Sequence, residues 1–428
     1  MKIFPLKSFE ATLENIAADK SISHRFAIFS LLSDKTSKAR NYLLAEDTLN
    51  TLELIRSLGA KVERKNSEVF ITPPLNIKEP NSILECGNSG TLMRLMLGFL
   101  AGVESFFVLS GDRYLNNRPM KRLSKPLQEI GAKIYGREGA NFAPLCIEGK
   151  KLKSFTYESK IASAQVKTAL ILAGFKANGL CKFSEPFLSR NHSENMLLAM
   201  DAPLRISKDG LSLEISPLKS TLKPLDISIP NDPSSAFYFV LAALILPNSK
   251  ITIKNVLLNQ TRIEAYEILR KMGAKIEYES YEKSFEKIGE IRAFSSELKG
   301  IEVSKNIAWL IDEAPALAIA FAFAKGKSVL KNAKELRVKE SDRIKAMVSN
   351  LQKCGVKIKE LEDGFEIVGG FEMTKFTQIQ SFGDHRIAMS FAIFGLVYGV
   401  EIDDTECIKT SFPNFLELLE QIGAKIGN

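Results

Sequence analysis

The sequence predicts an α/β protein of two domains, each built from three copies of one repeat. The first observation is a helix ending that occurs six times, at intervals of 68 to 82 residues. The second is a series of six very apolar helices that keeps step with these endings. The third is length, because 428 residues, 45% of them hydrophobic, are too many for one core. Two domains of three repeats are the simplest grouping.

Each helix ending carries the phrase Gly-Ala-Lys or a variant of it, followed by apolar residues that predict a strand. A residue that tolerates the left-handed conformation is usual just after a helix, and glycine tolerates it best. Asp201 replaces glycine in one copy, and Asp adopts this conformation more readily than most residues. The six predicted ends are Gly59, Gly131, Asp201, Gly273, Gly355 and Gly423.

An earlier helix in each repeat has a polar start and is apolar on nearly every side. Such a helix is expected to be buried inside its domain. Further strands are expected between the two helices of each repeat. The six predicted starts are Ser21, Gly90, Ser163, Ser234, Glu313 and His385.

The last repeat has no room for its final strand, because only five residues follow Gly423. The apolar opening, Met1–Leu6, could supply that strand, and both termini would then lie in one domain. The chain would cross between domains twice, near Glu14–Asp19 and near Asp226–Pro233, where turn residues gather. The expected domains are residues 14–228, and residues 1–13 together with 229–428, with the active site in the cleft between them.

Composition restricts the partners without choosing among them. The net charge of +8 favours an anionic partner, which could be nucleic acid, a membrane surface or a phosphorylated metabolite. The five cysteines form no CxxC pair, so neither a disulfide framework nor a zinc site is indicated. The longest apolar run, Ala236–Leu246, has 11 residues, whereas a membrane span needs about 20. The opening segment lacks the continuous apolar core of a signal peptide, so we expect a cytoplasmic protein.

Basic, hydroxyl and amide side chains gather at the predicted helix starts, where free N–H groups favour anions. A single Lys or Arg there is more often a solvated charge than a ligand. Ser21, Ser163 and Ser189 could be helix caps, and Asp312 and Glu313 could be charges favoured by the helix dipole. However, the clusters fall at corresponding places in independent repeats, which chance explains poorly. We therefore expect cations from both domains to face one cleft.

The same segments resemble the 5-enolpyruvylshikimate-3-phosphate synthase family, in order and along nearly the whole chain. The matching segments are Asp19–Arg25, Gly87–Arg94, Arg118-Pro119, Ser163–Lys167, Ile311–Pro315, Leu336–Arg343 and Gly383–Met389. The resemblance implies two domains, each of three βαβαββ units with buried parallel helices, in an inside-out α/β barrel arrangement. It also implies that phosphoenolpyruvate and shikimate 3-phosphate give the 5-enolpyruvyl ether and phosphate, in chorismate and aromatic amino-acid synthesis. No metal or organic cofactor, no nucleic acid and no membrane partner is implied, and we expect a monomer.

The resemblance further implies which residues bind the two anions. Those for shikimate 3-phosphate are Lys20, Ser21, Arg25, Ser163, Ala164, Gln165, Ser189, Asp312 and Lys339. Those for phosphoenolpyruvate are Lys20, Asn88, Gly90, Arg118, Gln165, Arg343 and Arg386. Arginine suits this task because its planar fork pairs with two oxygens of a carboxylate or phosphate. By the same resemblance, Gly90 implies inhibition by glyphosate in competition with phosphoenolpyruvate.

The implied reaction needs a base and an acid. The 5-hydroxyl loses a proton as it attacks C2 of phosphoenolpyruvate, while the vinyl C3 gains one. We assign Asp312 as the proton acceptor and Glu340 as the proton donor, with Lys20 assisting. Departures from some relatives touch secondary contacts: Ala164 stands for a second serine, His192 for a tyrosine and Glu335 for an asparagine. Thr410 takes the place of a lysine near the C-terminus, and no catalytic role is assigned to the adjacent Lys409.

Two other functions remain open on the residues. The first is enolpyruvyl transfer to UDP-N-acetylglucosamine by the sister enzyme, which usually carries a reactive cysteine shortly before an Arg-Pro. The run before Arg118, GDRYLNN, has no cysteine. The second is a non-enzymatic anion or nucleic-acid binder. Nucleic-acid readers usually place aromatic residues among their basic clusters, and the clusters here do not show that pattern.

Overall fold

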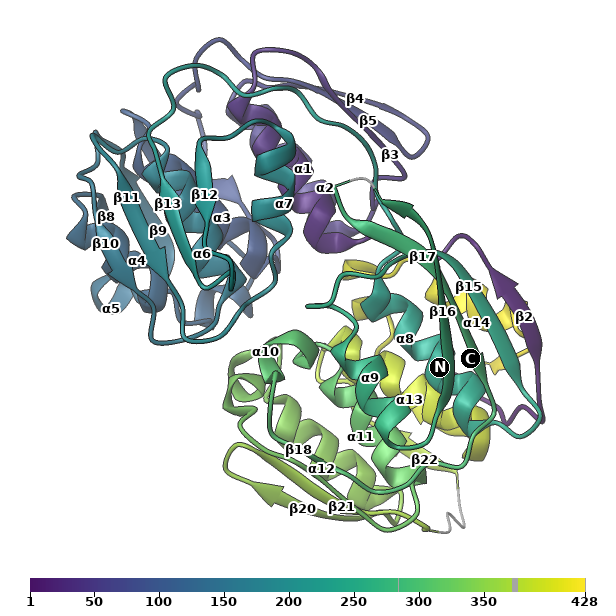
Figure 1. Ribbon diagram of the computed structural model, residues 1–428. Coiled ribbons are helices and arrows are strands. Elements are labelled where there is room, and N and C mark those ends of the chain that lie inside the picture. The colour runs from purple at the N-terminus through teal and green to yellow at the C-terminus, as the bar shows by residue number, and fades with distance from the viewer. Residues whose placement is uncertain (284, 372–375, 428) are drawn as a thin grey trace. The chain divides into compact units, whose positions relative to one another are not determined.

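The computed structural model describes residues 1–283, 285–371 and 376–427. The chain divides into two compact units (Figure 1). One is Lys20–Ile229, called here the N-terminal unit. The other is Met1–Asp19 with Pro230–Asn428, called here the C-terminal unit. Within the described ranges each unit holds three four-stranded sheets.

The strands of the N-terminal unit form three sheets of one design. Their bounds are β3 (Ser37–Arg40), β4 (Lys61–Lys65), β5 (Glu68–Thr72), β6 (Leu84–Glu85), β7 (Phe106–Ser110), β8 (Lys133–Gly136), β9 (Phe142–Glu148), β10 (Thr156–Glu158), β11 (Cys181–Ser184), β12 (Leu204–Ile206), β13 (Ser212–Ile215) and β14 (Asp226–Ser228). The orders are β14-β3-β5-β4, β6-β7-β9-β8 and β10-β11-β13-β12. In each, the first two strands pair in parallel and the others antiparallel.

The C-terminal unit repeats this design. Its strands are β1 (Lys2–Ile3), β2 (Glu10–Leu13), β15 (Lys250–Leu257), β16 (Lys275–Lys283), β17 (Lys287–Phe294), β18 (Glu302–Val303), β19 (Lys327–Leu330), β20 (Lys357–Leu361), β21 (Gly364–Val368), β22 (Thr377–Ile379), β23 (Val400–Ile402) and β24 (Ile426–Gly427). The orders are β2-β15-β17-β16, β18-β19-β21-β20 and β22-β23-β1-β24. The parallel pair again comes first in each.

The two ends of the chain meet in the last sheet, where the N and C labels of Figure 1 lie side by side. β1 pairs antiparallel with both β23 and β24, so the N-terminal strand does join the last repeat. The prediction that no strand follows Gly423 was wrong, because β24 forms over Ile426–Gly427. Two residues suffice there, since β1 offers them a backbone ready for pairing.

At each crossing, the strand that comes just before a unit's first helix belongs to a sheet of the other unit. β2 precedes the first helix of the N-terminal unit but pairs with β15, whereas β14 precedes the first helix after Pro230 but pairs with β3. Within the C-terminal unit, Arg262 binds the two chain segments at which the crossings begin and end. Its Nη1 donates to Asp19 Oδ2 at 2.5 Å and its Nη2 to Asp232 Oδ1 at 2.8 Å. All three side chains are buried.

The predicted apolar helices form and are buried. They are α1 (Lys20–Phe29), α3 (Gly90–Ala101), α6 (Ala164–Gly174), α8 (Pro233–Ile245), α11 (Ala314–Phe323) and α13 (His385–Tyr398). α3 and α6 approach closely at Gly98, where a methyl group would lie 2.2 Å from the backbone oxygen of Ala169. A glycine is required at that position, because any side chain would separate the two helices. Within the described ranges no helix has the length and apolar character needed to cross a bilayer.

The second helix of each repeat ends as predicted. These helices are α2 (Glu46–Ser57), α4 (Lys121–Glu129), α7 (His192–Ala199), α9 (Glu264–Lys271), α12 (Arg343–Lys353) and α14 (Phe415–Gln421), with the short α5 (Arg137–Ala140) and α10 (Ile307–Leu310) beside them. All six predicted ends have positive φ, from 61° at Asp201 to 106° at Gly131. The repeat prediction is thereby confirmed at every copy.

Candidate active site

Lys20 and Arg25 lie on α1, a buried helix that nevertheless carries charged side chains. Lys20 Nζ lies 3.1 Å from Asp47 Oδ2 on α2, and the Lys20 side chain keeps 20% of its surface exposed. His24 between them is fully buried, and its Nδ1 lies 2.7 Å from Thr51 Oγ1. Burial, with the nearby charges of Lys20 and Arg25, holds the pKa of His24 well below its usual value. This histidine is therefore a neutral hydrogen-bonding group.

Arg25 joins three helices of the N-terminal unit. Its Nε donates to Ser193 Oγ on α7 at 2.7 Å, and its Nη2 to Thr168 Oγ1 on α6 at 3.3 Å. Its Nη1 donates to the backbone oxygen of Ser21 at 3.1 Å. Arg25 is only 3% exposed. Hydroxyl and carbonyl acceptors on the three helices thus fix the guanidinium of Arg25.

A second cluster surrounds the start of α3. Arg118 Nη2 donates to Asn88 Oδ1, and Asn88 Nδ2 donates to Asp112 Oδ2 at 2.7 Å. A methyl group at Gly90 would lie 3.0 Å from Arg94 Nη1 and 3.2 Å from Arg118 Nη1. The absence of a side chain at Gly90 therefore lets two buried arginines approach the first turn of the helix.

Gln165 connects this cluster to α6. Its Oε1 accepts from Arg94 Nη1 at 2.8 Å, and its Nε2 donates to Thr91 Oγ1 at 3.0 Å. Arg94 belongs to the quoted Gly87–Arg94 motif, yet the sequence reasoning gave it no role. The signal that was missed is the spacing of four from Gly90, which puts both residues on one face of a helix.

The serines of the N-terminal unit differ in what they do. Ser163 is the N-cap of α6, and its Oγ accepts from the backbone N–H of Val166. The capping interpretation therefore holds for Ser163. It fails for Ser189, because Asn191 is the N-cap of α7. Ser189 instead donates from its backbone N and its Oγ to Glu185 Oε1, at 2.8 and 3.0 Å.

In the C-terminal unit, Arg343 stands at the centre of a group of carboxylates. Its Nη1 lies 3.7 Å from Asp312 Oδ1, its Nη2 donates to Glu340 Oε2 at 2.7 Å, and its Nε donates to Asp384 Oδ2 at 2.8 Å. Lys339 Nζ lies 3.9 Å from the same Asp312 oxygen. Burial opposes the charged form of Arg343, but Asp384, Glu340 and Asp312 outweigh it and raise the pKa of the guanidinium.

Arg386 lies at the start of α13, which Asp384 caps by accepting from the backbone N–H of Arg386 at 2.9 Å. The Arg386 side chain is buried. Burial opposes its charge, but Tyr238 and the neighbouring carboxylates raise the pKa of Arg386 above its ordinary value. Burial also raises the pKa of Tyr238, so this tyrosine stays protonated beside a charged guanidinium.

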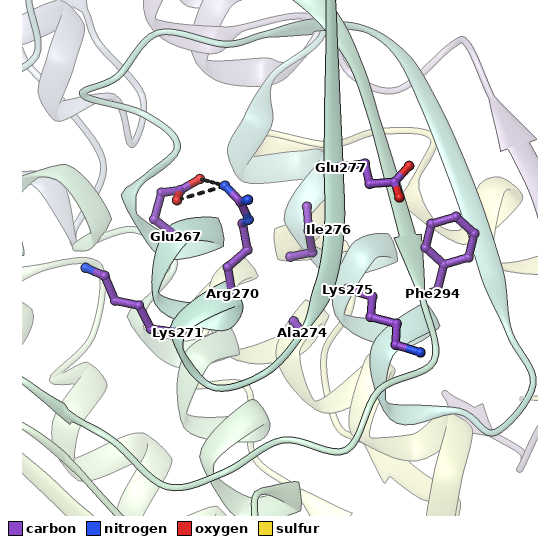
Figure 2. Close-up of a pocket in the computed structure, with 8 residues that line it drawn as sticks. All are labelled: Glu267, Arg270, Lys271, Ala274, Lys275, Ile276, Glu277 and Phe294. Carbon is purple, nitrogen blue, oxygen red and sulfur yellow. Dashed lines mark hydrogen bonds and ion pairs between the residues drawn. The ribbon is translucent and has the colours of Figure 1, made fainter.

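A hollow of about 630 Å³ lies elsewhere in the C-terminal unit, between α9, β16 and β17 (Figure 2). Glu267 and Arg270 form an ion pair on its wall, as Figure 2 shows. None of the predicted site residues lines it. This hollow is therefore not the candidate site.

Comparison with known proteins identifies the family. The EPSP synthase (3-phosphoshikimate 1-carboxyvinyltransferase) family model matches residues 5–419. The chain belongs to the EPSP synthase family. A curated 3-phosphoshikimate 1-carboxyvinyltransferase of Campylobacter jejuni serotype O:2 is 70% identical over 427 residues, covering 100% of both chains. That of Campylobacter concisus is 62% identical, covering 100% of this chain and 99% of its own.

Solved structures agree. The EPSP synthase from Acinetobacter baumannii is 36% identical, with a TM-score of 0.86, and the match covers 100% of this chain and 99% of that one. The enolpyruvyl transferase NikO from Streptomyces tendae is 14% identical, with a TM-score of 0.80 and coverage of 99% and 97%, and so supports the fold alone. The predicted family and fold class are confirmed.

The site residues predicted from the sequence fall into two sets, one in each unit of this EPSP synthase family member. Lys20, Ser21, Arg25, Asn88, Gly90, Arg118, Ser163, Ala164, Gln165 and Ser189 belong to the N-terminal unit, and Asp312, Lys339, Glu340, Arg343 and Arg386 to the C-terminal unit. Each set forms contacts of its own, and the joining of the two sets in one site stays a prediction. Among the departures, Glu335 Oε1 lies 3.4 Å from Lys339 Nζ, and Thr410 Oγ1 lies 3.4 Å from His385 Nδ1. Lys409 pairs with Glu406 on the surface.

Proposed function

We propose that this chain transfers the enolpyruvyl group of phosphoenolpyruvate to the 5-hydroxyl of shikimate 3-phosphate, releasing phosphate. The reaction belongs to the synthesis of chorismate and the aromatic amino acids. The observation that carries the proposal is the family match over residues 5–419, together with relatives 70% identical along the whole chain. The side-chain clusters then support a role for each residue.

In this proposal the N-terminal unit supplies most of the shikimate 3-phosphate contacts. Arg25 presents a buried positive charge, while Ser163 and Ser189 lie at the start of α6 and just before α7. The partial positive charge at a helix N-terminus adds to the attraction for a phosphate. Lys339, from the C-terminal unit, supplies a further cation. The full proposed set is Lys20, Ser21, Arg25, Ser163, Ala164, Gln165, Ser189, Asp312 and Lys339.

Phosphoenolpyruvate carries a carboxylate and a phosphate, and the proposal gives it three arginines. Arg118 is held by Asn88, and Arg343 and Arg386 lie near Asp384 at the start of α13. Planar guanidinium groups bind such oxygens in pairs, and their burial makes the attraction stronger than in water. The full proposed set is Lys20, Asn88, Gly90, Arg118, Gln165, Arg343 and Arg386.

The chemistry proposed has two steps. In the addition step, the 5-oxygen bonds to C2 while its proton passes to Asp312. The double bond breaks as C3 takes a proton from Glu340. In the elimination step, the bond from C2 to the phosphate oxygen breaks and the departing phosphate takes the proton held by Asp312. The C3 methyl group returns a proton to Glu340, and the double bond forms again. Arg343 contacts both carboxylates and so holds Asp312 and Glu340 in one group. Lys20 assists at the developing charge.

The two units would have to bring both substrates together. Holding two reactants in a reactive geometry lowers the barrier by as much as ~7–11 kcal/mol in favourable cases. Domain closure that excludes water would add to this effect. The proposed site therefore needs side chains from both units, although each set of contacts is already formed within its own unit.

A cytoplasmic monomer is also part of the proposal. All five cysteines are free, as is usual in a reducing compartment. The apolar helices α8 and α11 bury their apolar side chains within their own unit, so they need no second copy to cover them. Sedimentation equilibrium would test the monomer directly.

The roles are tested by kinetics of Asp312→Asn. We expect kcat to fall at least about 100-fold, since a general base contributes factors of this size. The dissociation constant of shikimate 3-phosphate, from calorimetry, should stay within about threefold of wild type. Glu362→Gln is the matched control, because Glu362 pairs with Lys334 on the surface of the same unit. Equal losses in binding and turnover for Asp312→Asn would remove it from the role of base.

A further inference from the structure

A charged network is buried inside the N-terminal unit, beneath the residues proposed to bind shikimate 3-phosphate. Lys167 on α6 lies with its Nζ 2.8 Å from Glu185 Oε1 and 2.6 Å from Glu194 Oε1 on α7. The three side chains are 1%, 0% and 2% exposed. Lys167, Glu185 and Glu194 are called here the buried ion group. None of them belongs to the binding or catalytic sets named above.

The buried ion group reaches the proposed substrate site through Ser189. Glu185 Oε1 accepts the Ser189 backbone N–H at 2.8 Å and the Ser189 hydroxyl at 3.0 Å, in addition to Lys167. One carboxylate oxygen thus fixes both the backbone and the side chain of a single serine. Within the part of the chain that the structure describes, the Ser189 hydroxyl donates to no other acceptor.

The neighbours of the ion group in sequence reach Arg25 in the same way. Thr168 follows Lys167 on α6, and Ser193 precedes Glu194 on α7. Their hydroxyl oxygens lie 2.5 Å apart, and both accept from Arg25, at 3.3 and 2.7 Å. Neighbouring residues of α6 and α7 therefore contact two proposed ligands. Thr168 and Ser193 contact Arg25, and Lys167 contacts Glu185, which in turn accepts from Ser189.

The charge of the ion group is hard to explain by stability alone. One lysine faces two glutamates, and Glu185 Oε2 and Glu194 Oε2 are buried with no hydrogen-bond partner among the described residues. Buried charges of this kind stabilise a fold little compared with apolar side chains of the same volume. A carboxylate next to Ser189 would also repel a phosphate bound there, unless a cation neutralised it. Lys167 offsets part of that charge, because it pairs with both glutamates.

We infer that the buried ion group positions the phosphate-binding end of the shikimate 3-phosphate site. Glu185 orients Ser189, Lys167 offsets part of the negative charge beside the bound anion, and Glu194 anchors Lys167 to α7. These three are positioning residues, since they act through Ser189. The inference rests on the proposed function, because it takes Ser189 and Arg25 as ligands of shikimate 3-phosphate.

The test is Glu185→Ala in the full-length enzyme. Lys167 keeps Glu194 as its partner in this variant, so the buried charge becomes balanced and we expect the protein to fold. Ser189 loses its acceptor, so the KM and calorimetric dissociation constant of shikimate 3-phosphate should rise about fivefold, the loss expected for one hydrogen bond. The value of kcat and the KM of phosphoenolpyruvate should stay within about twofold of wild type.

Two further variants make the result specific. Glu185→Gln keeps an oxygen that can accept from Ser189, so it should restore shikimate 3-phosphate affinity to within about twofold of wild type. Glu214→Ala removes a glutamate on the surface of the same unit, where it pairs with Lys182, and should change nothing. Should Glu185→Ala fail to fold, Glu185→Asp takes its place, because its side chain is one methylene shorter, which withdraws the carboxylate from Ser189 and should raise the same KM.

The outcomes separate the inference from the proposed function. One outcome overturns the inference alone: the wild-type enzyme turns over the two substrates, and a folded Glu185→Ala variant has an unchanged KM for shikimate 3-phosphate. A lower kcat with both KM values unchanged does so too, because that pattern is what a purely structural role would give. Absence of wild-type turnover with the two substrates overturns the proposed function and, with it, the inference.

Discussion

Gly90→Ala should weaken phosphoenolpyruvate binding without weakening the fold. The new methyl group would lie 3.0 Å from Arg94 Nη1 and 3.2 Å from Arg118 Nη1, closer than ordinary van der Waals contact. Both arginines are only 7% exposed, so each can yield only by shifting its guanidinium by a few tenths of an ångström. Arg118 is a proposed phosphoenolpyruvate ligand, and its displacement should cost about 1.4 kcal/mol, or a tenfold rise in KM.

Stability should move in the opposite direction. Gly90 is the first residue of α3 and has no positive φ, so alanine meets no backbone strain there. Replacing glycine by alanine in a helix stabilises it by up to about 1 kcal/mol, and less at the first position. The free energy of unfolding should therefore stay equal or rise slightly, while KM for phosphoenolpyruvate increases.

Steady-state kinetics with each substrate varied in turn provide the assay, with glyphosate inhibition as a second readout. We expect about a tenfold rise in KM for phosphoenolpyruvate, little change in KM for shikimate 3-phosphate, and weaker glyphosate inhibition. Gly179→Ala is the matched control, because a methyl group there meets Ser154 Cβ at 3.3 Å in a loop with no proposed ligand. Equal rises in both KM values, or no change in either, would refute the argument from Gly90.

Three other predictions test the surroundings of the site. Arg262→Met removes the guanidinium that pairs with the buried carboxylates Asp19 and Asp232. Urea denaturation should therefore show a loss of about 3–5 kcal/mol in the free energy of unfolding, as is usual when one partner of a buried ion pair is removed. A loss below about 1 kcal/mol would contradict this. His24 is neutral in the folded protein, because burial and the charges of Lys20 and Arg25 hold its pKa low. In the unfolded state the same histidine takes up a proton below a pH of about 6.5. The free energy of unfolding should then fall with falling pH by up to about 1.4 kcal/mol per unit, and His24→Asn should reduce that slope, whereas equal slopes would exclude His24 as the cause. Arg94→Gln should raise KM for phosphoenolpyruvate about tenfold, since Arg94 contacts Gln165 and borders Gly90; an unchanged KM would deny it any role in binding.

The repeats could be predicted because each leaves a local signal. A helix that ends in the left-handed conformation selects glycine, or aspartate at Asp201, whatever the rest of the fold does. The burial of the first helices likewise follows from their composition alone. Pairings between distant segments leave no such signal. The exchange of β2 and β14 at the crossings, and the pairing of β24 with β1, depend on which backbones meet in space.

The site shows the same division. Arg118, Gln165 and Arg343 stand in recognisable motifs, and the structure gives each a contact within its unit. The role of Ser189 was harder to read, because its acceptor, Glu185, has no motif of its own. In the sequence, Lys167 stands out only as the last residue of the matching segment Ser163–Lys167, although it is buried between two carboxylates. A charge that is buried and paired looks the same in a sequence as one that is solvated.

The central claim is that the chain transfers enolpyruvate to shikimate 3-phosphate. A coupled assay of phosphate release tests it most directly, with phosphoenolpyruvate present and either shikimate 3-phosphate or UDP-N-acetylglucosamine as the acceptor. We predict release with shikimate 3-phosphate that requires both substrates, and none above background with UDP-N-acetylglucosamine. Release with UDP-N-acetylglucosamine and not with shikimate 3-phosphate would contradict the account.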